Sequence, residues 1–173
     1  MKRDFSELFG LELIENKVFR DERGDLNKIQ LPVKNVFHSV IYSNNFLAGT
    51  VRGLHFQNQP YGEVKIVTCI RGEMVDFIVD MRETSETFGD WAEIRLSSRH
   101  TNSLLVPEGF AHGYQTLEDA TTVLYSISGS HKSDHSVVMN IQDLDLGIVL
   151  PMEISEISSR DREGQSFKSF REI

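Results

Sequence analysis

Two short segments of the sequence contain residue types that suit proton transfer and the binding of a charged substrate. Residues 51–57 (VRGLHFQ) place an arginine, a histidine and a glutamine within six positions, bracketed by apolar residues. Residues 106–113 (VPEGFAHG) combine a turn-forming proline and glycine with a histidine at the start of the next strand. Because histidine has an unperturbed pKa of ~6.5, it is largely neutral near pH 7 and can accept a proton. The two segments predict a polar pocket that contains His55 and His112.

The second segment also fits the P-x-G-x-x-H motif of cupin barrels, in which histidine and glutamate side chains hold a metal ion. The matching ligands would be His55, Gln57 and His112. Two histidines without a third strong ligand form a poor site for a divalent transition metal, so the sequence favours a pocket without metal or cofactor. A metal-dependent oxygenase or isomerase that uses these three residues is the alternative.

Alternation of apolar and polar residues predicts that short β-strands carry these side chains. Residues 64–80 alternate on both sides of a turn at 71–73, which predicts a hairpin with Lys65 in its first strand. In the segment that contains the first histidine, the same period of two places Arg52 and His55 on opposite faces of the strand.

Further strands are predicted at residues 91–96 and 121–128, and Tyr125 lies in the second of them. Clusters of glycine, proline, asparagine and serine separate the runs at short spacing. This pattern is typical of an all-β fold, either an antiparallel sandwich, a barrel or a jelly roll. Short helices are expected within the first ten residues and in the tail after Pro151.

Length and composition limit the possible classes of protein. The 173 residues predict one domain, spanning residues 1–173, and the formal net charge of −8 disfavours nucleic acid as a partner. The single cysteine excludes an intramolecular disulfide. No apolar run approaches the ~18 residues of a membrane helix, and the first residues lack the apolar core of a signal peptide. We therefore expect a cytoplasmic protein without a membrane partner.

Several segments, in this order along the chain, resemble the dTDP-4-dehydrorhamnose 3,5-epimerase family of sugar-nucleotide epimerases. The resemblance covers residues 11–165. The segments that carry it are residues 19–24 (FRDERG), 52–57 (RGLHFQ), 65–67 (KIV), 79–82 (VDMR), 85–91 (SETFGDW), 107–113 (PEGFAHG), 143–148 (DLDLGI) and 158–161 (SSRD).

The resemblance implies a cupin-type jelly roll that binds no metal and forms a homodimer by exchanging an N-terminal strand. It implies epimerisation at C3, C5 or both carbons of a nucleoside-diphosphate 4-keto-6-deoxyhexose, in deoxysugar and polysaccharide biosynthesis. The matching catalytic residues are His55 as the base, Asp161 as the carboxylate that orients it, Tyr125 as the acid on the opposite face, and Lys65 as the cation beside the sugar 4-oxygen. The matching substrate contacts are Arg23, which would reach the partner's pocket, and Arg52, Gln57, His112 and Arg160.

Three positions depart from the family pattern in the region that contacts nucleotide and sugar. Ser130 stands where a second tyrosine is usual, Lys28 replaces a glutamate, and Ile41 replaces an asparagine. These departures leave open which sugar is bound and whether the enzyme is a 3-epimerase only.

Two other classes compete with the epimerase hypothesis. A 3,4-ketoisomerase would share the fold and the 4-keto substrate, but such enzymes lack the RGLHFQ run of residues 52–57. A non-catalytic carbohydrate-binding jelly roll would require none of the set His55, Asp161 and Tyr125.

Overall fold

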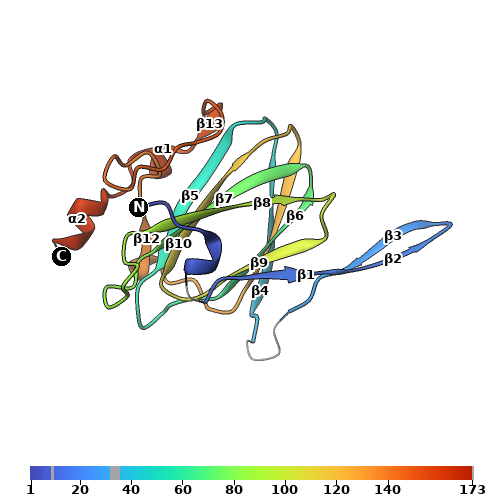
Figure 1. Ribbon diagram of the computed structural model, residues 1–173, viewed down its shortest axis with the longest axis horizontal. Coiled ribbons are helices and arrows are strands. Elements are labelled where there is room, and N and C mark those ends of the chain that lie inside the picture. The colour runs from blue at the N-terminus through green and yellow to red at the C-terminus, as the bar shows by residue number, and fades with distance from the viewer. Residues whose placement is uncertain (9, 32–35, 173) are drawn as a thin grey trace.

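Over the residues that the structure describes (1–8, 10–31 and 36–172), the computed structural model has two β-sheets packed face to face (Figure 1). Their strands run antiparallel, except that β13 pairs with β5 in parallel. The first sheet has the order β1 (Glu12–Glu15), β9 (Asn102–Val106), β6 (Lys65–Arg71), β11 (Thr121–Ile127), β4 (Ser39–Asn45). The second has the order β12 (Ser136–Val138), β5 (Thr50–Gln57), β10 (Phe110–Thr116), β7 (Glu73–Asp80), β8 (Trp91–Ser97), with β13 (Glu156–Ile157) beside β5. The predicted antiparallel jelly roll is confirmed.

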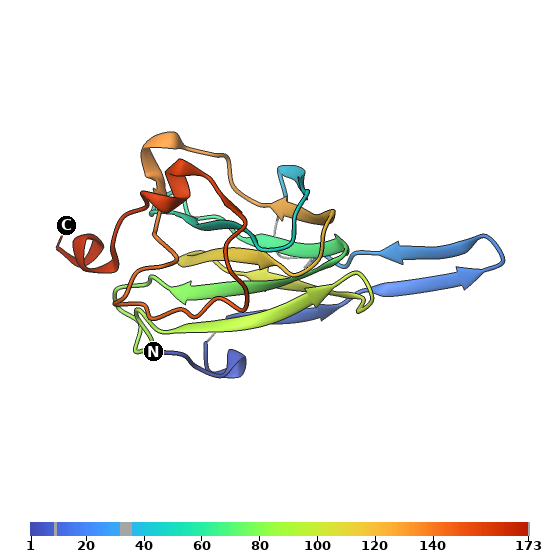
Figure 2. The same ribbon diagram turned by 90° about the horizontal axis from the view of Figure 1, so that it is seen from above.

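A hairpin and several short helices extend from this body. Strands β2 (Lys17–Asp21) and β3 (Gly24–Lys28) pair with each other and project away from the sheets as an arm (Figures 1 and 2). The short helices are η1 (Phe5–Glu7), η2 (Ser133–His135), α1 (Ser159–Arg162) and α2 (Phe167–Arg171). The positions of η1, α1 and α2 confirm the short helices expected within the first ten residues and after Pro151, whereas η2 was not predicted. Within the described residues, no helix combines the length and apolarity needed to cross a membrane.

The prediction that residues 64–80 form a hairpin is wrong, because β6 and β7 belong to different sheets. A turn at Gly72, whose φ of +76° lies in the left-handed region, carries the chain from one sheet to the other. Inward side chains of the two strands, including Val67 and Met74, meet in the core between the sheets. Packing of two apolar strands face to face leaves the same alternation in the sequence as pairing them edge to edge, so the pattern did not distinguish the two arrangements.

Strand β5 departs from regular alternation at Gly53, and as a result Arg52 and His55 both line the same pocket. Gly53 has a φ of +114°, and the pairing of β5 with β10 shifts register opposite it. A Cβ on Gly53 would lie 2.5 Å from the Cα of Gly113, so the two backbones approach too closely for any residue with a side chain. The expectation that Arg52 and His55 face opposite sides is wrong, because it assumed an unbroken strand.

Apolar residues pack in two layers on either side of the second sheet. The interior core, between the two sheets, contains Val67, Cys69, Met74, Ile78, Leu96, Leu104 and Val123. The outer core, between the second sheet and the C-terminal segment, contains Leu54, Phe56, Phe77, Met139, Ile141 and Phe167. The outer core therefore holds the segment that carries α1 against β5.

Cys69, a residue of β6, provides a test of this arrangement because its side chain faces the interior core. Burial raises the pKa of its thiol to about 11. At pH 8, ionisation alone should make its alkylation by iodoacetamide about two-hundredfold slower in the folded protein than for an unfolded cysteine with a pKa of ~8.5. The measurement is the labelling rate by mass spectrometry, with the protein in guanidinium chloride as the control. Labelling of the folded protein at the unfolded rate would place Cys69 at the surface.

Candidate active site

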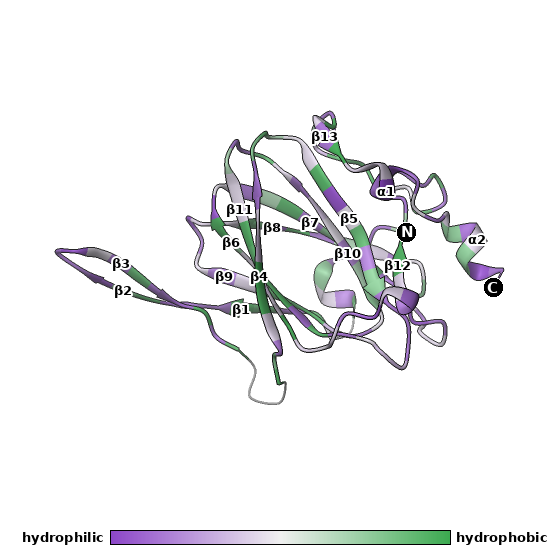
Figure 3. Ribbon diagram, turned by 180° about the vertical axis from the view of Figure 1, so that it is seen from behind, coloured by the Kyte–Doolittle hydropathy of each residue, from purple (hydrophilic) through white to green (hydrophobic). Residues whose placement is uncertain are grey.

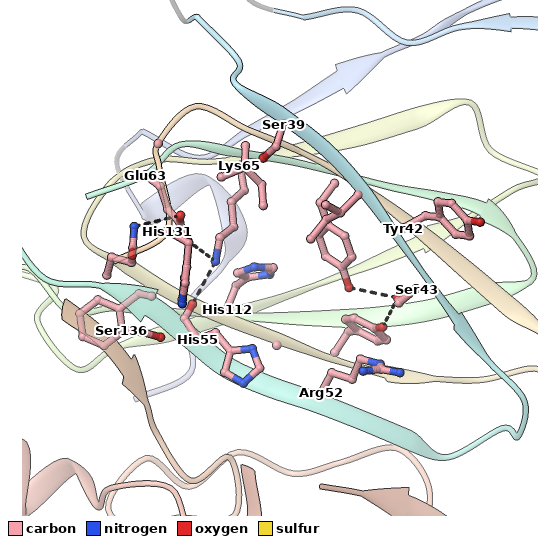
Figure 4. Close-up of a pocket in the computed structure, with 18 of the residues that line it drawn as sticks. Ser39, Tyr42, Ser43, Arg52, His55, Glu63, Lys65, His112, His131 and Ser136 are labelled. Carbon is pink, nitrogen blue, oxygen red and sulfur yellow. Dashed lines mark hydrogen bonds and ion pairs between the residues drawn. The ribbon is translucent and has the colours of Figure 1, made fainter. Parts of the chain in front are cut away.

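A pocket of about 530 Å³ opens between the two sheets beside the interior core. Its walls come from β4, β6 and β11 of the first sheet and from β5 and β10 of the second. Figure 4 shows the polar side chains that point into it, which come from both sheets. The jelly roll thus brings together side chains that are far apart in the sequence.

On the wall formed by the second sheet, His55 is held by a carboxylate. Its Nε2 lies 2.7 Å from Oδ1 of Asp161, while the other oxygen of that carboxylate accepts a hydrogen bond from the Gly53 amide at 3.2 Å. Burial, the largest single effect, would raise the pKa of Asp161, but the hydrogen bond and charge of His55 together with the hydrogen bonds from Gly53 and Ser158 outweigh it, and the pKa is lowered. The carboxylate is therefore ionised and fixes both the orientation and the tautomer of the imidazole.

A short helix places the carboxylate at this point. Helix α1 starts after Ser158, whose side chain accepts a hydrogen bond from the Asp161 amide at 3.1 Å. This cap directs the carboxylate back onto β5, although His55 lies 106 positions earlier in the sequence.

On the opposite wall, β11 contributes Tyr125. Its hydroxyl lies 3.5 Å from the Ser43 hydroxyl, as one of the dashed lines in Figure 4 marks. Burial raises the pKa of Tyr125 well above its usual value, and the neighbouring Tyr114 adds to the shift. The pocket therefore has an imidazole on one wall and a protonated phenol on the other.

Lys65 is held within the pocket by a carboxylate that the sequence analysis did not single out. Its Nζ lies 3.0 Å from Oε1 of Glu63, and the two side chains are only 10% and 11% exposed. The Gln57 amide donates to the other oxygen of Glu63 at 3.1 Å. Residues two apart share a face of a strand, so the spacing of Glu63 and Lys65 is compatible with a contact between them. Alternation alone does not show which residues of a face form an ion pair. The pair presents a fixed ammonium group to the pocket.

His112 is paired with a second buried carboxylate, also missed in the sequence. Its Nδ1 lies 3.3 Å from Oδ1 of Asp76, which is fully buried in β7. The sequence does contain a signal for this buried carboxylate, because Asp76 interrupts an otherwise apolar run at residues 74–79 (MVDFIV). Burial lowers the pKa of His112, and the positive charge of Lys65 lowers it further. His112 is therefore a neutral group beside the Lys65 ammonium.

Comparison with known proteins identifies the family. A family model described as dTDP-4-dehydrorhamnose 3,5-epimerase matches residues 6–169. The chain belongs to the dTDP-4-dehydrorhamnose 3,5-epimerase family. A curated member from Methanothermobacter thermautotrophicus is 35% identical over 182 residues, which cover 95% of this chain and 92% of that protein. Members of this family are epimerases, which belong to the isomerase class of enzymes.

Solved structures of related epimerases have the same fold. The dTDP-4-dehydrorhamnose 3,5-epimerase from Bacillus anthracis, solved with TDP and PPi bound, is 33% identical and has a TM-score of 0.85, covering 91% of this chain and 94% of that one. An epimerase from Mycobacterium tuberculosis is 30% identical, with a TM-score of 0.90 and coverage of 99% of this chain and 91% of that one.

The remaining residues matched to the epimerase family lie partly inside the pocket and partly outside it. Arg52 and Arg160 line it, and Arg160 donates to the Ser136 hydroxyl at 3.2 Å. Arg23 lies outside, at the turn of the arm, where it forms an ion pair with Asp21 at 2.5 Å and its side chain is 84% exposed. Within one chain, therefore, the arm residue and the pocket are separate.

The positions that depart from the epimerase-family pattern also separate in space. Ile41 lines the pocket, Lys28 ends the second strand of the arm, and Ser130 is exposed at the pocket mouth. The neighbouring His131, rather than Ser130, is the residue that lines the pocket there. The departure from the epimerase-family pattern at Ser130 therefore lies next to an imidazole that faces the pocket.

Gln57 forms hydrogen bonds with the residues around it at the edge of this epimerase-family pocket. Its Nε2 donates to the Tyr61 carbonyl at 2.9 Å as well as to Glu63, and its Oε1 accepts from the Lys132 amide at 2.6 Å. Of the three donors of the metal-dependent alternative, the Gln57 oxygen already accepts a hydrogen bond from the backbone. Among the described residues, no three histidine, cysteine or acidic side chains form a group suited to a metal.

We expect His112 to stay neutral at pH values where an exposed histidine with a pKa of ~6.5 is half protonated. Burial lowers the pKa of His112 most, and Lys65 and His55 lower it further, whereas Asp76 raises it. The unfolded chain then takes up a proton that the folded chain does not, so the free energy of unfolding falls as the pH drops below ~6.5, by at most ~1.4 kcal/mol per pH unit.

The measurement is an NMR titration of the imidazole ring together with urea unfolding at pH 5 to 8. The variant His112→Gln should lose this part of the slope, whereas His100→Gln, at an exposed position, should keep it. A titration of His112 near the ordinary value would contradict the environment described.

Proposed function

We propose that this protein epimerises a nucleoside-diphosphate 4-keto-6-deoxyhexose, with thymidine diphosphate as the nucleotide, at C3, C5 or both. The observation that carries the proposal is the pocket with the His55–Asp161 pair on one wall and Tyr125 on the other. A family member solved with TDP and PPi bound supports the choice of nucleotide. This function belongs to deoxysugar biosynthesis, and we expect it to take place in the cytoplasm.

Inversion of a carbon next to a ketone requires two proton transfers on opposite faces of the sugar. His55 takes the proton from the carbon, and the electron pair of the broken C–H bond moves into an enolate with its charge on the 4-oxygen. The Lys65 ammonium stabilises that oxygen in a partly desolvated site. Tyr125 then gives its proton to the carbon from the other face. Exchange with solvent restores both groups, so the reaction consumes no oxidant or cofactor.

The basic and neutral polar groups of the pocket provide substrate contacts. Arg52 and Arg160 line it and suit the diphosphate, because a guanidinium donates two hydrogen bonds in a fork. The neutral His112 lies near Lys65 and suits a sugar hydroxyl or the 4-oxygen. Gln57 lines the pocket, where it holds Glu63 and the loop at the pocket mouth, and it is a further substrate contact in this proposal.

We further propose a homodimer in which the arm reaches the partner. The opposed residues Phe19 and Leu26 of the arm are 54% and 68% exposed. A two-stranded hairpin alone is marginally stable in water, so the arm needs a surface to cover. Strand β4, the last strand of its sheet among the described residues, presents apolar positions that Figure 3 shows in green, including Val40 at 62% exposure. Crossing of the arm onto β4 of a second copy would bring Arg23 to the partner's pocket.

The two proton-transfer roles predict different defects. His55→Asn should reduce uptake of deuterium from D₂O by a factor on the order of 10² or more, because the positioned base is lost. Tyr125→Phe should still exchange deuterium, because His55 can return a solvent-derived proton to the same face, but it should form little inverted product. The measurement is NMR of deuterium content and configuration at C3 and C5 over time, with thymidine diphosphate-linked 4-keto-6-deoxyglucose as the substrate.

The matched control is Tyr61→Phe, which removes a phenol hydroxyl outside the pocket and should match the parent enzyme. Wild-type exchange in His55→Asn would remove that residue from the mechanism. Inversion by Tyr125→Phe at the parent rate would show that another group delivers the proton.

The dimer proposal predicts that the apolar face of the arm controls assembly. The double variant Phe19→Asp, Leu26→Asp should shift the mass measured by light scattering at micromolar concentration from dimer to monomer, because it places charges in the interface. The control is Leu144→Asp, at a residue that is 95% exposed in the C-terminal segment. Arg23→Ala should remain a dimer while its KM rises. A parent protein that is monomeric and fully active would overturn the proposal.

A further inference from the structure

Three histidines line the pocket, and His131 differs from the other two in the surroundings of its ring. The imidazoles of His55 and His112 each contact a carboxylate, at 2.7 and 3.3 Å. Over the residues that the structure describes, the ring of His131 takes part in no hydrogen bond or ion pair, and the residue is exposed. Both of its ring nitrogens are therefore available to a molecule bound in the pocket.

The backbone on both sides of His131 is anchored to β5 through Gln57. The side-chain oxygen of Gln57 accepts from the amide of Lys132 at 2.6 Å, and its Nε2 donates to the carbonyl of Ser130 at 3.4 Å. Because the residues before and after His131 are both held, its Cα has a fixed place and only the side-chain torsions remain to be ordered. A contact made by this ring would therefore cost little conformational entropy.

The position of Gln57 places His131 at the end of the pocket that also holds Lys65. Gln57 donates to Glu63 at 3.1 Å, and Glu63 pairs with Nζ of Lys65 at 3.0 Å. Arg52 lies five residues before Gln57 on β5, which at the rise of a strand corresponds to roughly 15 Å. Figure 4 shows the same separation, with Glu63 and His131 at one end and Arg52 at the other.

A 4-keto-6-deoxyhexose can satisfy both ends of the pocket in one orientation. Its diphosphate is attached at C1 and its 4-oxygen lies across the ring. A diphosphate at Arg52 and a 4-oxygen at Lys65 therefore direct the C4 edge of the sugar toward His131. The neighbours of the ketone on that edge are the 3-hydroxyl and the 6-methyl group, and only the hydroxyl can hydrogen-bond to an imidazole. The Glu63 carboxylate lines the same end and would repel a diphosphate placed there.

We propose that His131 binds the 3-hydroxyl of the sugar and makes the pocket selective for 4-keto sugars that carry a hydroxyl next to the ketone. This inference rests on the proposed function and adds the feature of the sugar that is recognised. The imidazole can donate to the hydroxyl oxygen or accept the hydroxyl hydrogen, so the contact forms whichever way that hydrogen points.

The test compares two substrates in the variant His131→Ala. They are thymidine diphosphate-linked 4-keto-6-deoxyglucose and its 3-deoxy analogue, which keeps exchangeable hydrogens at C3 and C5. For the first, kcat/KM of deuterium exchange from D₂O should fall about three- to tenfold, the effect expected for one lost hydrogen bond. For the analogue it should stay within about twofold, because the group that His131 contacts is missing. Inhibition by thymidine diphosphate alone should be unchanged, because that molecule lacks the hexose.

The matched control is His135→Ala. This histidine lies in η2, where its ring packs against that of Tyr61 with centroids 4.5 Å apart, away from the pocket lining. The control should keep the parent values with both substrates. A second variant, His131→Phe, keeps a ring but has no nitrogen. It should show the same selective loss as His131→Ala, which excludes an effect of the space that alanine leaves.

The outcomes distinguish this inference from the function on which it rests. An equal fall with both substrates, or weaker inhibition by thymidine diphosphate, would place His131 beside the diphosphate with Arg160 and overturn the hydroxyl contact alone. Parent values of His131→Ala with both substrates would overturn it as well. If the parent protein exchanged deuterium into neither substrate, the proposed function itself would be wrong.

Discussion

The close approach of β5 and β10 at Gly53 and Gly113 is the constraint on which the site depends. Each glycine occupies the space where the other's Cβ would lie: a Cβ on Gly53 would meet the Gly113 Cα at 2.5 Å, and one on Gly113 would meet the Gly53 Cα at 2.8 Å. The irregular backbone turns Arg52 and His55 to the same side. It also leaves the Gly53 amide directed at the Asp161 carboxylate. One local distortion thus serves both the substrate side of the pocket and the orientation of the base.

Carboxylates hold the nitrogen-bearing side chains of the pocket in place. Three buried or nearly buried carboxylates, those of Glu63, Asp76 and Asp161, each contact a lysine or histidine that lines the cavity. These partners fix the cations and imidazoles in place. A buried charge without a partner would be costly, so the carboxylates are as necessary to the site as the groups that face the substrate. Arg52 and Arg160 also line the cavity, so an acidic chain of net charge −8 can present cationic groups to a diphosphate.

The sequence predicted the class of fold and most of the residues that meet in the pocket, but not how the strands pair or how the pocket is supported. Period two revealed which residues are inward, yet it carries no record of whether β6 and β7 are neighbours or face each other. The resemblance to a family supplied His55, Asp161 and Tyr125, whose meeting in space no local pattern indicates. Ser43, Tyr114 and Asn45 stayed invisible because each is an ordinary strand residue. Their contacts with one another exist only in the folded chain.

The distant origin of Asp161 makes the site depend on the last part of the chain. The strands from β4 to β11 form both walls of the pocket, and they precede Asp161 in the chain. The carboxylate reaches His55 because the outer core holds the C-terminal segment against β5. A substitution at Phe167, which packs in that core and does not line the pocket, would therefore disturb the orientation of the imidazole from outside the cavity.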